Sequence, residues 1–292
     1  MPILDSLDLN KLSKLRLNVR HVVEGLLSGL HSSPYKGQSL EFAQHREYSP
    51  GDEIRHVDWK VFGRSDRFFI KQYQDETNLR AYILLDSSGS MKYSSKGQPS
   101  KLNYAAHIAG AIAYLLLKQE DAVSLGAFDD SLRFYLPPNH QTSHLQEIFR
   151  KLEGVEAGGE TGIGKVLKGF GRHIRRRGLI ILVSDLLAEP RKVIETLKYF
   201  RCRHHEILVI QVLDPEEVKF RFSGENTFVQ LEGNAEISAD SDTVRDEYRQ
   251  LMKNFIDEYK HSFRRSRIEY AMATTDMPLE KTIYNALMYG NK

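Results

Sequence analysis

The sequence predicts an α/β fold with a doubly wound, mostly parallel sheet and helices on both of its faces. Between residues 79 and 213, short apolar segments typical of buried strands alternate with longer segments of helical periodicity. Two of the apolar segments, Tyr82–Leu85 and Leu179–Val183, lead directly to a carboxylate. Ligand sites of open α/β sheets form at the carboxyl ends of the strands, so this pattern also predicts where a site would lie.

The expected elements follow one another with short connections. Strands are predicted at 79–86, 121–128, 179–184, 207–213 and 268–274, with a hairpin extension at 131–136. Helices are predicted at 101–119, 143–152, 164–177, 190–200, 243–265 and 279–289. Strands that alternate with helices in this way favour a parallel sheet covered on both faces.

Two further parts complete the predicted organisation. Residues 1–78 are expected to form an N-terminal segment packed on the main domain, with amphipathic helices in 7–31 and short strands after them. Residues 79–292 form the main domain. It carries a β-hairpin insertion near 218–238, whose predicted strands are 219–222 and 227–231.

Composition narrows the possible functions. The 292 residues carry a formal net charge of +2, so the chain as a whole is not drawn to nucleic acid or to an anionic membrane. A single cysteine, Cys202, excludes a disulfide within the chain and fits a reducing compartment. The N-terminus has no signal-peptide pattern, and the apolar stretch Ala109–Leu117 is too short to span a bilayer. A cytoplasmic protein is expected.

The most informative stretch is Asp86-Ser-Ser88-Gly-Ser90, directly after a predicted strand. Its carboxylate and alternating hydroxyls are oxygen donors of the kind that Mg²⁺ takes, and Mg²⁺ usually keeps water-filled positions. Asp and Ser after a strand can also simply cap a turn. Two other segments favour the metal interpretation: the glycine-rich loop around Thr161, and Asp185 at the end of the predicted strand 179–184.

These residues resemble the metal-ion-dependent adhesion site of the von Willebrand factor A-type fold. Its pattern is D-x-S-x-S, then a Thr, then an Asp at a strand end. The resemblance implies that the hydroxyls of Ser88 and Ser90 bind the metal directly and that Thr161 does so when a partner is bound. Asp86 and Asp185 would act mostly through water molecules. Mg²⁺ is the expected ion, with Mn²⁺ and Ca²⁺ as alternatives.

A second resemblance rests on the segment from Glu41 to Lys60. The segment is similar to the signature of a bacterial domain-of-unknown-function family, number fifty-eight, which carries the A-type domain. The likeness is carried by Arg46, Tyr48, Gly51, Asp52, Arg55, Asp58, Trp59 and Arg64. Members are commonly encoded beside MoxR-type AAA+ ATPases, which implies an adaptor or co-chaperone role. The charged residues of the segment could equally form structural ion pairs, with Trp59 as a core anchor.

Together these features predict a non-enzymatic, metal-dependent protein-interaction module that binds an acidic residue of a partner. One alternative is nucleotide binding, because Gly159–Lys165 matches G-x-x-x-x-G-K. Position 166 is a valine, however, so the hydroxyl that such a loop gives to Mg²⁺ is missing. The other alternative is a metal-independent scaffold that binds through the hairpin or the N-terminal helices.

Overall fold

The computed structural model describes residues 40–47, 61, 68–75, 79–233 and 235–288. The chain divides into two compact units, one formed by Ser33–Leu79 and the other containing Arg80–Lys292. In the smaller unit, strands β1 (Leu40–Glu47) and β2 (Phe69–Asp75) pair antiparallel. The predicted helices in 7–31 and most of the signature segment lie outside the described residues.

The larger unit is built on a six-stranded sheet. Five neighbouring strands are parallel, and only the edge strand β5 runs antiparallel to its neighbour β4. The strand order is β10 (Glu269–Thr274), β7 (Glu206–Leu213), β6 (Leu179–Ser184), β3 (Arg80–Asp86), β4 (Ala122–Phe128) and β5 (Leu132–Asn139). This confirms the predicted fold class, a doubly wound and mostly parallel α/β sheet.

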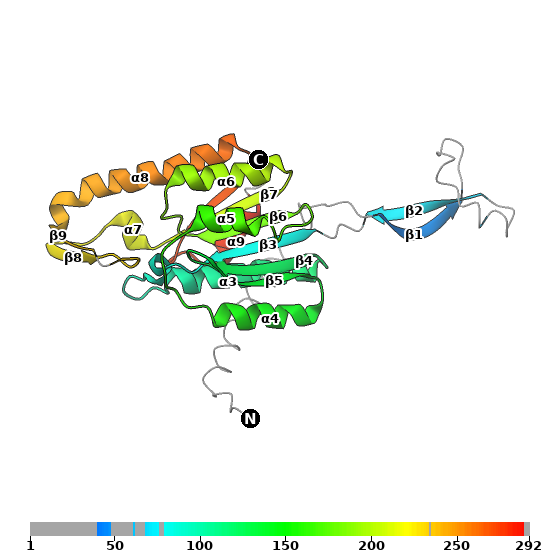
Figure 1. The fold of residues 1–292 in the computed structure, drawn as a ribbon, viewed down its shortest axis with the longest axis horizontal. Helices are drawn as coiled ribbons and strands as arrows, with labels where there is room; N and C mark the ends of the chain where they lie inside the picture. The colour runs from blue at the N-terminus through cyan, green and yellow to red at the C-terminus, as the bar shows by residue number, and fades with distance from the viewer. Residues whose placement is uncertain (1–39, 48–60, 62–67, 76–78, 234, 289–292) are drawn as a thin grey trace, which may run out of the picture. The chain divides into compact units, whose positions relative to one another are not determined.

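Helices cover both faces of the sheet (Figure 1). On one face lie α3 (Lys101–Lys118), α4 (Thr142–Glu153) and α9 (Leu279–Met288). On the other face lie α5 (Ile163–Phe170), α6 (Pro190–Cys202) and α8 (Ser241–Arg265). Among the described residues, no helix combines the length and the apolar character that crossing a membrane requires.

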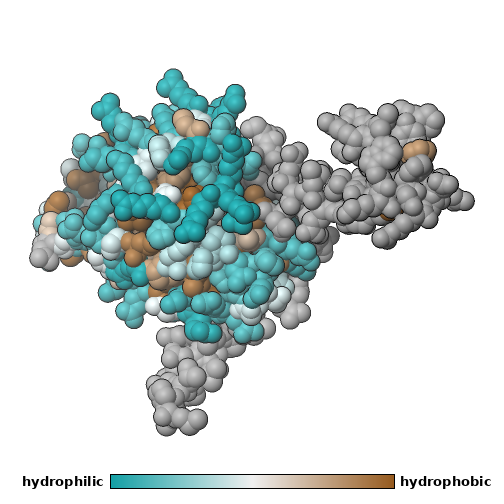
Figure 2. Space-filling view, turned by 45° about the vertical axis from the view of Figure 1, so that its right-hand side comes forward, coloured by the Kyte–Doolittle hydropathy of each residue, from teal (hydrophilic) through white to brown (hydrophobic). Residues whose placement is uncertain are grey.

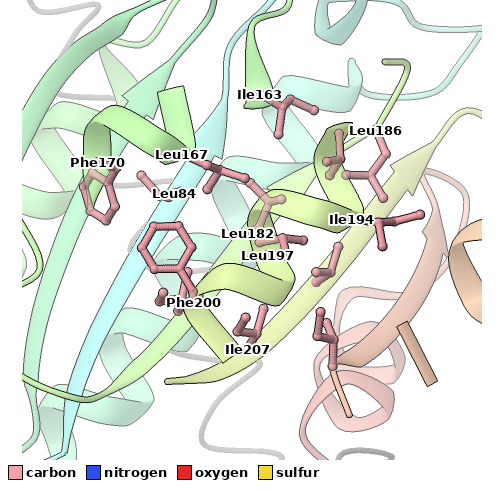
Figure 3. Close-up of a cluster of buried hydrophobic side chains, with 14 of the residues drawn as sticks. Leu84, Ile163, Leu167, Phe170, Leu182, Leu186, Ile194, Leu197, Phe200 and Ile207 are labelled. Atoms are coloured by element: carbon pink, nitrogen blue, oxygen red, sulfur yellow. The ribbon is translucent and has the colours of Figure 1, made fainter. Parts of the chain in front are cut away.

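The hydrophobic core explains why the central strands are apolar along their whole length. Every residue of β6 is buried, because helices pack on both of its faces. On the α5–α6 side, Leu84 and Leu182 of adjacent strands meet Leu167 of α5 and Leu197 and Phe200 of α6 (Figure 3). Such a core fixes the strand ends relative to one another, and the candidate site is built on these ends.

Strands β3 and β6 are neighbours in the sheet, with Leu85 paired to Val183. From β3 the chain first builds β4 and β5 on one side and then crosses to build β6, β7 and β10 on the other. The sheet order therefore reverses between β3 and β6. A crevice forms at such a switch point, outside the carboxyl ends of the two strands.

The hairpin insertion is present; the predicted strand 227–231 overlaps its first strand, but the predicted strand 219–222 is wrong. Of residues 219–222, predicted as a strand, Lys219 ends the short helix α7 (Pro215–Lys219) and 220–222 form no strand. The hairpin pairs β8 (Glu225–Val229) with β9 (Glu236–Asp240). The physical reason is a capping box at the start of α7, where the Asp214 side chain accepts from the amide of Glu216 and Glu217 bonds back to the amide of Asp214. The turn of the hairpin thus falls at residues 230–235, where the prediction had placed the end of a strand.

Candidate metal site

The carboxyl end of β3 places Asp86 at the switch point. Its side chain is fully buried and accepts hydrogen bonds from the Ser88 amide (2.9 Å) and from the Ser184 hydroxyl at the end of β6 (2.5 Å). The bond from Ser184 links the two strand ends directly. Burial, together with the nearby charge of Asp185, raises the pKa of Asp86 to about 7. Two buried carboxyl groups therefore lie near each other where little water reaches them.

The two serines of the motif lie where the chain turns away from β3. Ser88 precedes a short 3₁₀ helix, η2 (Gly89–Lys92), which contains Ser90. The hydroxyl oxygens of Ser88 and Ser90 are 3.2 Å apart, so they face each other across the start of this turn. Both residues are buried. Two adjacent hydroxyl oxygens of this kind can act together as ligands of one hard cation.

The glycine-rich loop is attached to the same turn by backbone hydrogen bonds. The Gly89 amide donates to the Gly159 carbonyl, and the Gly158 amide donates to the Ser87 carbonyl, each at 2.9 Å. These bonds bring the Thr161 segment beside the serines. The Thr161 hydroxyl is shielded from solvent and has no hydrogen-bond partner within the described part of the chain. A buried hydroxyl without a partner costs free energy, which a ligand at this position would offset.

Arg133 of β5 also holds this loop, through hydrogen bonds to the loop backbone. The Arg133 guanidinium donates to the Asp129 carboxylate at 2.6 Å and to the carbonyls of Glu156 (3.0 Å) and Gly158 (2.9 Å). Burial alone would raise the pKa of Asp129, but hydrogen bonds from Ser131 and Arg133 outweigh it and lower that pKa. Asp129 thus stays charged and keeps Arg133 in place, so the part of the loop that precedes Thr161 is held by Arg133 as well as by the turn after β3.

Asp185 directly follows β6, and its fully buried carboxylate is bound on both oxygens. One oxygen accepts from the Leu187 amide (3.0 Å), and the other forms an ion pair with Lys101 (2.8 Å). Lys101 is itself fully buried and forms a second ion pair with Glu217 at 2.6 Å. Burial alone would lower the pKa of Lys101, but the charges of Asp185 and Glu217 outweigh it and raise that pKa.

The hairpin turn adds one more carboxylate to the site. One Glu232 oxygen accepts from the Ser90 amide (3.2 Å), and the other accepts from the Thr161 amide (3.0 Å). The Glu232 carboxylate thus links the backbone amides of Ser90 and Thr161, two of the three residues whose hydroxyls are candidate metal ligands. The turn approaches closely at Gly89, where an added Cβ would lie 2.5 Å from the Leu231 carbonyl oxygen. Only glycine at this position leaves room for the turn.

The five residues that the sequence singled out are therefore gathered at one edge of the sheet. Three hydroxyls and two carboxylates make an oxygen-only donor set, which suits Mg²⁺, Mn²⁺ or Ca²⁺ rather than a softer metal. Asp185, Glu217 and Glu232 contribute negative charge to this region, and Asp86 adds part of a charge because its pKa is raised to about 7. Lys101 is the one buried lysine or arginine that pairs with these carboxylates in the described chain. The unpartnered Thr161 hydroxyl and this excess of negative charge both fit a bound divalent cation.

Sequence reasoning missed Lys101, Glu217 and Glu232. Lys101 is the first residue of α3, directly after its cap Ser100, where a cation opposes the helix dipole. That unfavourable position was a usable signal for a buried ion pair. Glu232 offered no comparable signal, because its partners Ser90 and Thr161 lie 142 and 71 residues away in the chain.

The loop Gly159–Lys165 lacks the surroundings of a phosphate-binding loop. Helix α4 and an irregular segment precede it, whereas such a loop follows a buried strand. The Lys165 side chain is 75% exposed and points to Asp130, with its Nζ 3.8 Å from the carboxylate. The nucleotide-binding alternative therefore finds no support in this geometry.

Comparisons with known proteins identify relatives of this chain. The chain is 26% identical over 242 residues to two proteins described as uncharacterized, Rv1480 of Mycobacterium tuberculosis and Mb1516 of Mycobacterium bovis. The match covers 81% of this chain and 75% of each relative.

Solved structures with a similar fold include BatB of Bacteroides thetaiotaomicron, which is 20% identical with a TM-score of 0.48. The match covers 73% of this chain and 98% of BatB. Another is the VWA domain of SpRpn10, which is 12% identical with a TM-score of 0.43 and is covered to 97%, against 73% of this chain. A family model described as "Protein of unknown function DUF58" matches residues 44–255. The chain belongs to this DUF58 family.

Proposed function

We propose that the protein is a non-enzymatic interaction module that binds an acidic side chain of a protein partner through a divalent cation. Three observations support the proposal. The hydroxyl oxygens of Ser88 and Ser90 are 3.2 Å apart, and the Glu232 carboxylate links the amides of Ser90 and Thr161. The Thr161 hydroxyl is buried and has no partner among the described residues. The three hydroxyls would hold Mg²⁺, with Mn²⁺ or Ca²⁺ as alternatives. The cation would supply positive charge and an open position for the partner's carboxylate.

The protein's own residues would each contribute to that task. Asp86 and Asp185 would neutralise charge on the cation and orient its water ligands. Hydrogen bonds hold the carboxylate oxygens of both residues in fixed positions. Lys101 would hold Asp185 in position. Arg133 would hold the loop that carries Thr161 against the turn after β3 that contains Ser88 and Ser90. None of these roles requires a bond to be made or broken, which is why the proposal is of binding rather than catalysis.

The proposed partner is a MoxR-type AAA+ ATPase or its client, since the family resemblance implies that pairing, and the proposed location is the cytoplasm. The direct experiment immobilises the full chain and measures binding of the purified ATPase in Mg²⁺ and in EDTA. The proposal expects binding that disappears in EDTA and returns when Mg²⁺ is restored. Binding of equal strength in EDTA would favour the metal-independent scaffold instead.

Thr161→Val separates the structural role of this residue from its role as a metal ligand. In EDTA the variant should raise the free energy of unfolding by about 1 kcal/mol, because it removes a buried hydroxyl that lacks a partner. In Mg²⁺ it should lose affinity for the metal and for the ATPase. Chemical denaturation and calorimetric Mg²⁺ titration measure the two effects.

The matched control is Thr196→Val, since the Thr196 hydroxyl is also buried but donates to the Lys192 carbonyl at 2.8 Å. This control should lose about 1 kcal/mol in both buffers and keep its Mg²⁺ affinity. Unchanged metal affinity in Thr161→Val would remove Thr161 from the proposed site.

A further inference from the structure

The hairpin turn brings its own acidic side chain to the place where the proposed function needs a partner's carboxylate. Glu232 is bound through both oxygens to the amides of Ser90 and Thr161, two residues whose hydroxyls are proposed metal ligands. Each carboxylate oxygen has two lone pairs, so one bond from an amide leaves each oxygen able to accept again. The carboxylate is thus placed beside the hydroxyls and keeps its capacity to bind a cation.

The fit of the turn against the site is close. The Leu231 carbonyl and the Glu232 side chain lie against Gly89, where an added Cβ would be 2.5 Å from the Leu231 oxygen and 3.2 Å from the Glu232 Cγ. Gly89 separates the two serines of the motif in the sequence. The hairpin therefore contacts the site at its centre, through the one position between the serines that has no side chain.

The hairpin is not part of the main sheet. Strands β8 and β9 form a two-stranded sheet of their own, and such a hairpin alone is only marginally stable. A cavity of about 380 Å³ lies behind the turn, lined by Leu231 and Glu232 and by the aromatic rings of Phe220, Phe228 and Tyr248. Val229, Leu231 and Ile237 of the hairpin are large apolar residues that stay exposed. Figure 2 shows one face of the molecule, where hydrophilic side chains predominate and smaller apolar areas lie among them.

We propose that Glu232 is an internal acidic ligand of the cation site, which a partner's Asp or Glu must replace when it binds. This inference rests on the proposed function and adds its regulation. The chain in its resting state occupies its own docking position. The partner then competes with a carboxylate that is covalently tethered and therefore present at high effective concentration. Only an acidic segment that also displaces the hairpin would bind.

The test uses Mn²⁺ as the probe and counts its bound water molecules by water-proton relaxation in the full chain. Glu232→Gln keeps the side-chain size but removes the negative charge and one of the two acceptor oxygens. It should bind Mn²⁺ roughly tenfold more weakly and leave one additional exchangeable water on the ion. Added acetate should displace that water in the variant and have no effect on the wild type. Glu236→Gln is the matched control, because Glu236 is exposed on the same hairpin. It should behave as the wild type does.

A second variant distinguishes loss of a metal ligand from a purely structural effect of the substitution. Glu232→Ala removes the whole carboxylate, and acetate should restore part of its lost Mn²⁺ affinity if the carboxylate acts as a ligand. Equal water counts in the wild type and Glu232→Gln, with no rescue of Glu232→Ala by acetate, would overturn the internal ligand while leaving the metal site in place. Failure of the wild type to hold Mn²⁺ at all would overturn the proposed function as well, so the two failures are distinguishable.

Discussion

Replacing Lys101 with methionine should lower the free energy of unfolding by about 3–5 kcal/mol, because the carboxylates of Asp185 and Glu217 would lose the buried ammonium group that pairs with both. Asp185 is fully buried, and the Glu217 side chain is only 15% exposed, so water cannot replace the lysine ammonium at either one. Methionine fills a similar volume, which keeps the effect electrostatic rather than one of packing. Urea denaturation in EDTA measures the loss without a contribution from bound metal.

Two further variants test the origin of that loss. Lys118→Met changes an exposed lysine at the other end of the same helix and should alter stability by about 0.5 kcal/mol or less. The double variant Lys101→Met with Glu217→Gln also removes the negative charge of Glu217, one of the two carboxylates left without a counter-charge in the single variant. It should recover part of the stability, with a coupling energy of about 0.5–3 kcal/mol. A loss of under 1 kcal/mol in the single variant would contradict the proposed burial of the ion pairs.

Asp86→Ala should weaken Mg²⁺ binding by at least about 100-fold and abolish metal-dependent capture of the partner. The carboxylate lies at the centre of the site, where it accepts from Ser88 and Ser184, so its loss removes both charge and orientation. The fold should persist, since the pairing of β3 with β6 and the apolar core remain after the Ser184 bond is lost. Calorimetric Mg²⁺ titration measures the affinity, and circular dichroism checks the fold.

The matched control for this change is Asp130→Ala. Asp130 lies near the same loop, but its side chain is 59% exposed and its contact with Lys165 is at 3.8 Å. An exposed pair of this kind contributes little, so Mg²⁺ binding should stay at the wild-type level. Equal Mg²⁺ affinity in Asp86→Ala and the wild type would show that the cation, if bound, binds elsewhere.

The parts of the site that sequence reasoning found are those encoded locally. Asp86 and Asp185 follow apolar segments that can only be buried strands, and parallel strands deliver their ends to one edge. The serines come two and four residues after Asp86, so their position follows from the strand end. The fold class was predictable for the same reason, because the pattern of alternating strands and helices repeats along the chain.

The features of the fold and site that sequence reasoning missed depend on contacts between distant segments or on competing local signals. Alternating Phe220 and Phe222 suggested a strand, but both rings pack with Phe228 in an aromatic cluster after α7. The Asp214-Pro215 start of α7 was a readable helix signal that outweighs this alternation. The predicted helix 164–177 ends early, at Phe170. The approach of Glu232 to Ser90 follows from the placement of the whole hairpin, which periodicity does not encode.

The central claim is that the hydroxyls of Ser88 and Ser90, in the turn after β3, hold a divalent cation. The most direct test is a Mn²⁺ titration of the full chain, with bound Mn²⁺ measured by electron paramagnetic resonance. The wild type should bind one Mn²⁺ per chain, displaced by Mg²⁺, and the double variant Ser88→Ala with Ser90→Ala should not bind it at comparable concentrations. Binding of equal strength by the double variant, or no binding by the wild type, would contradict the account.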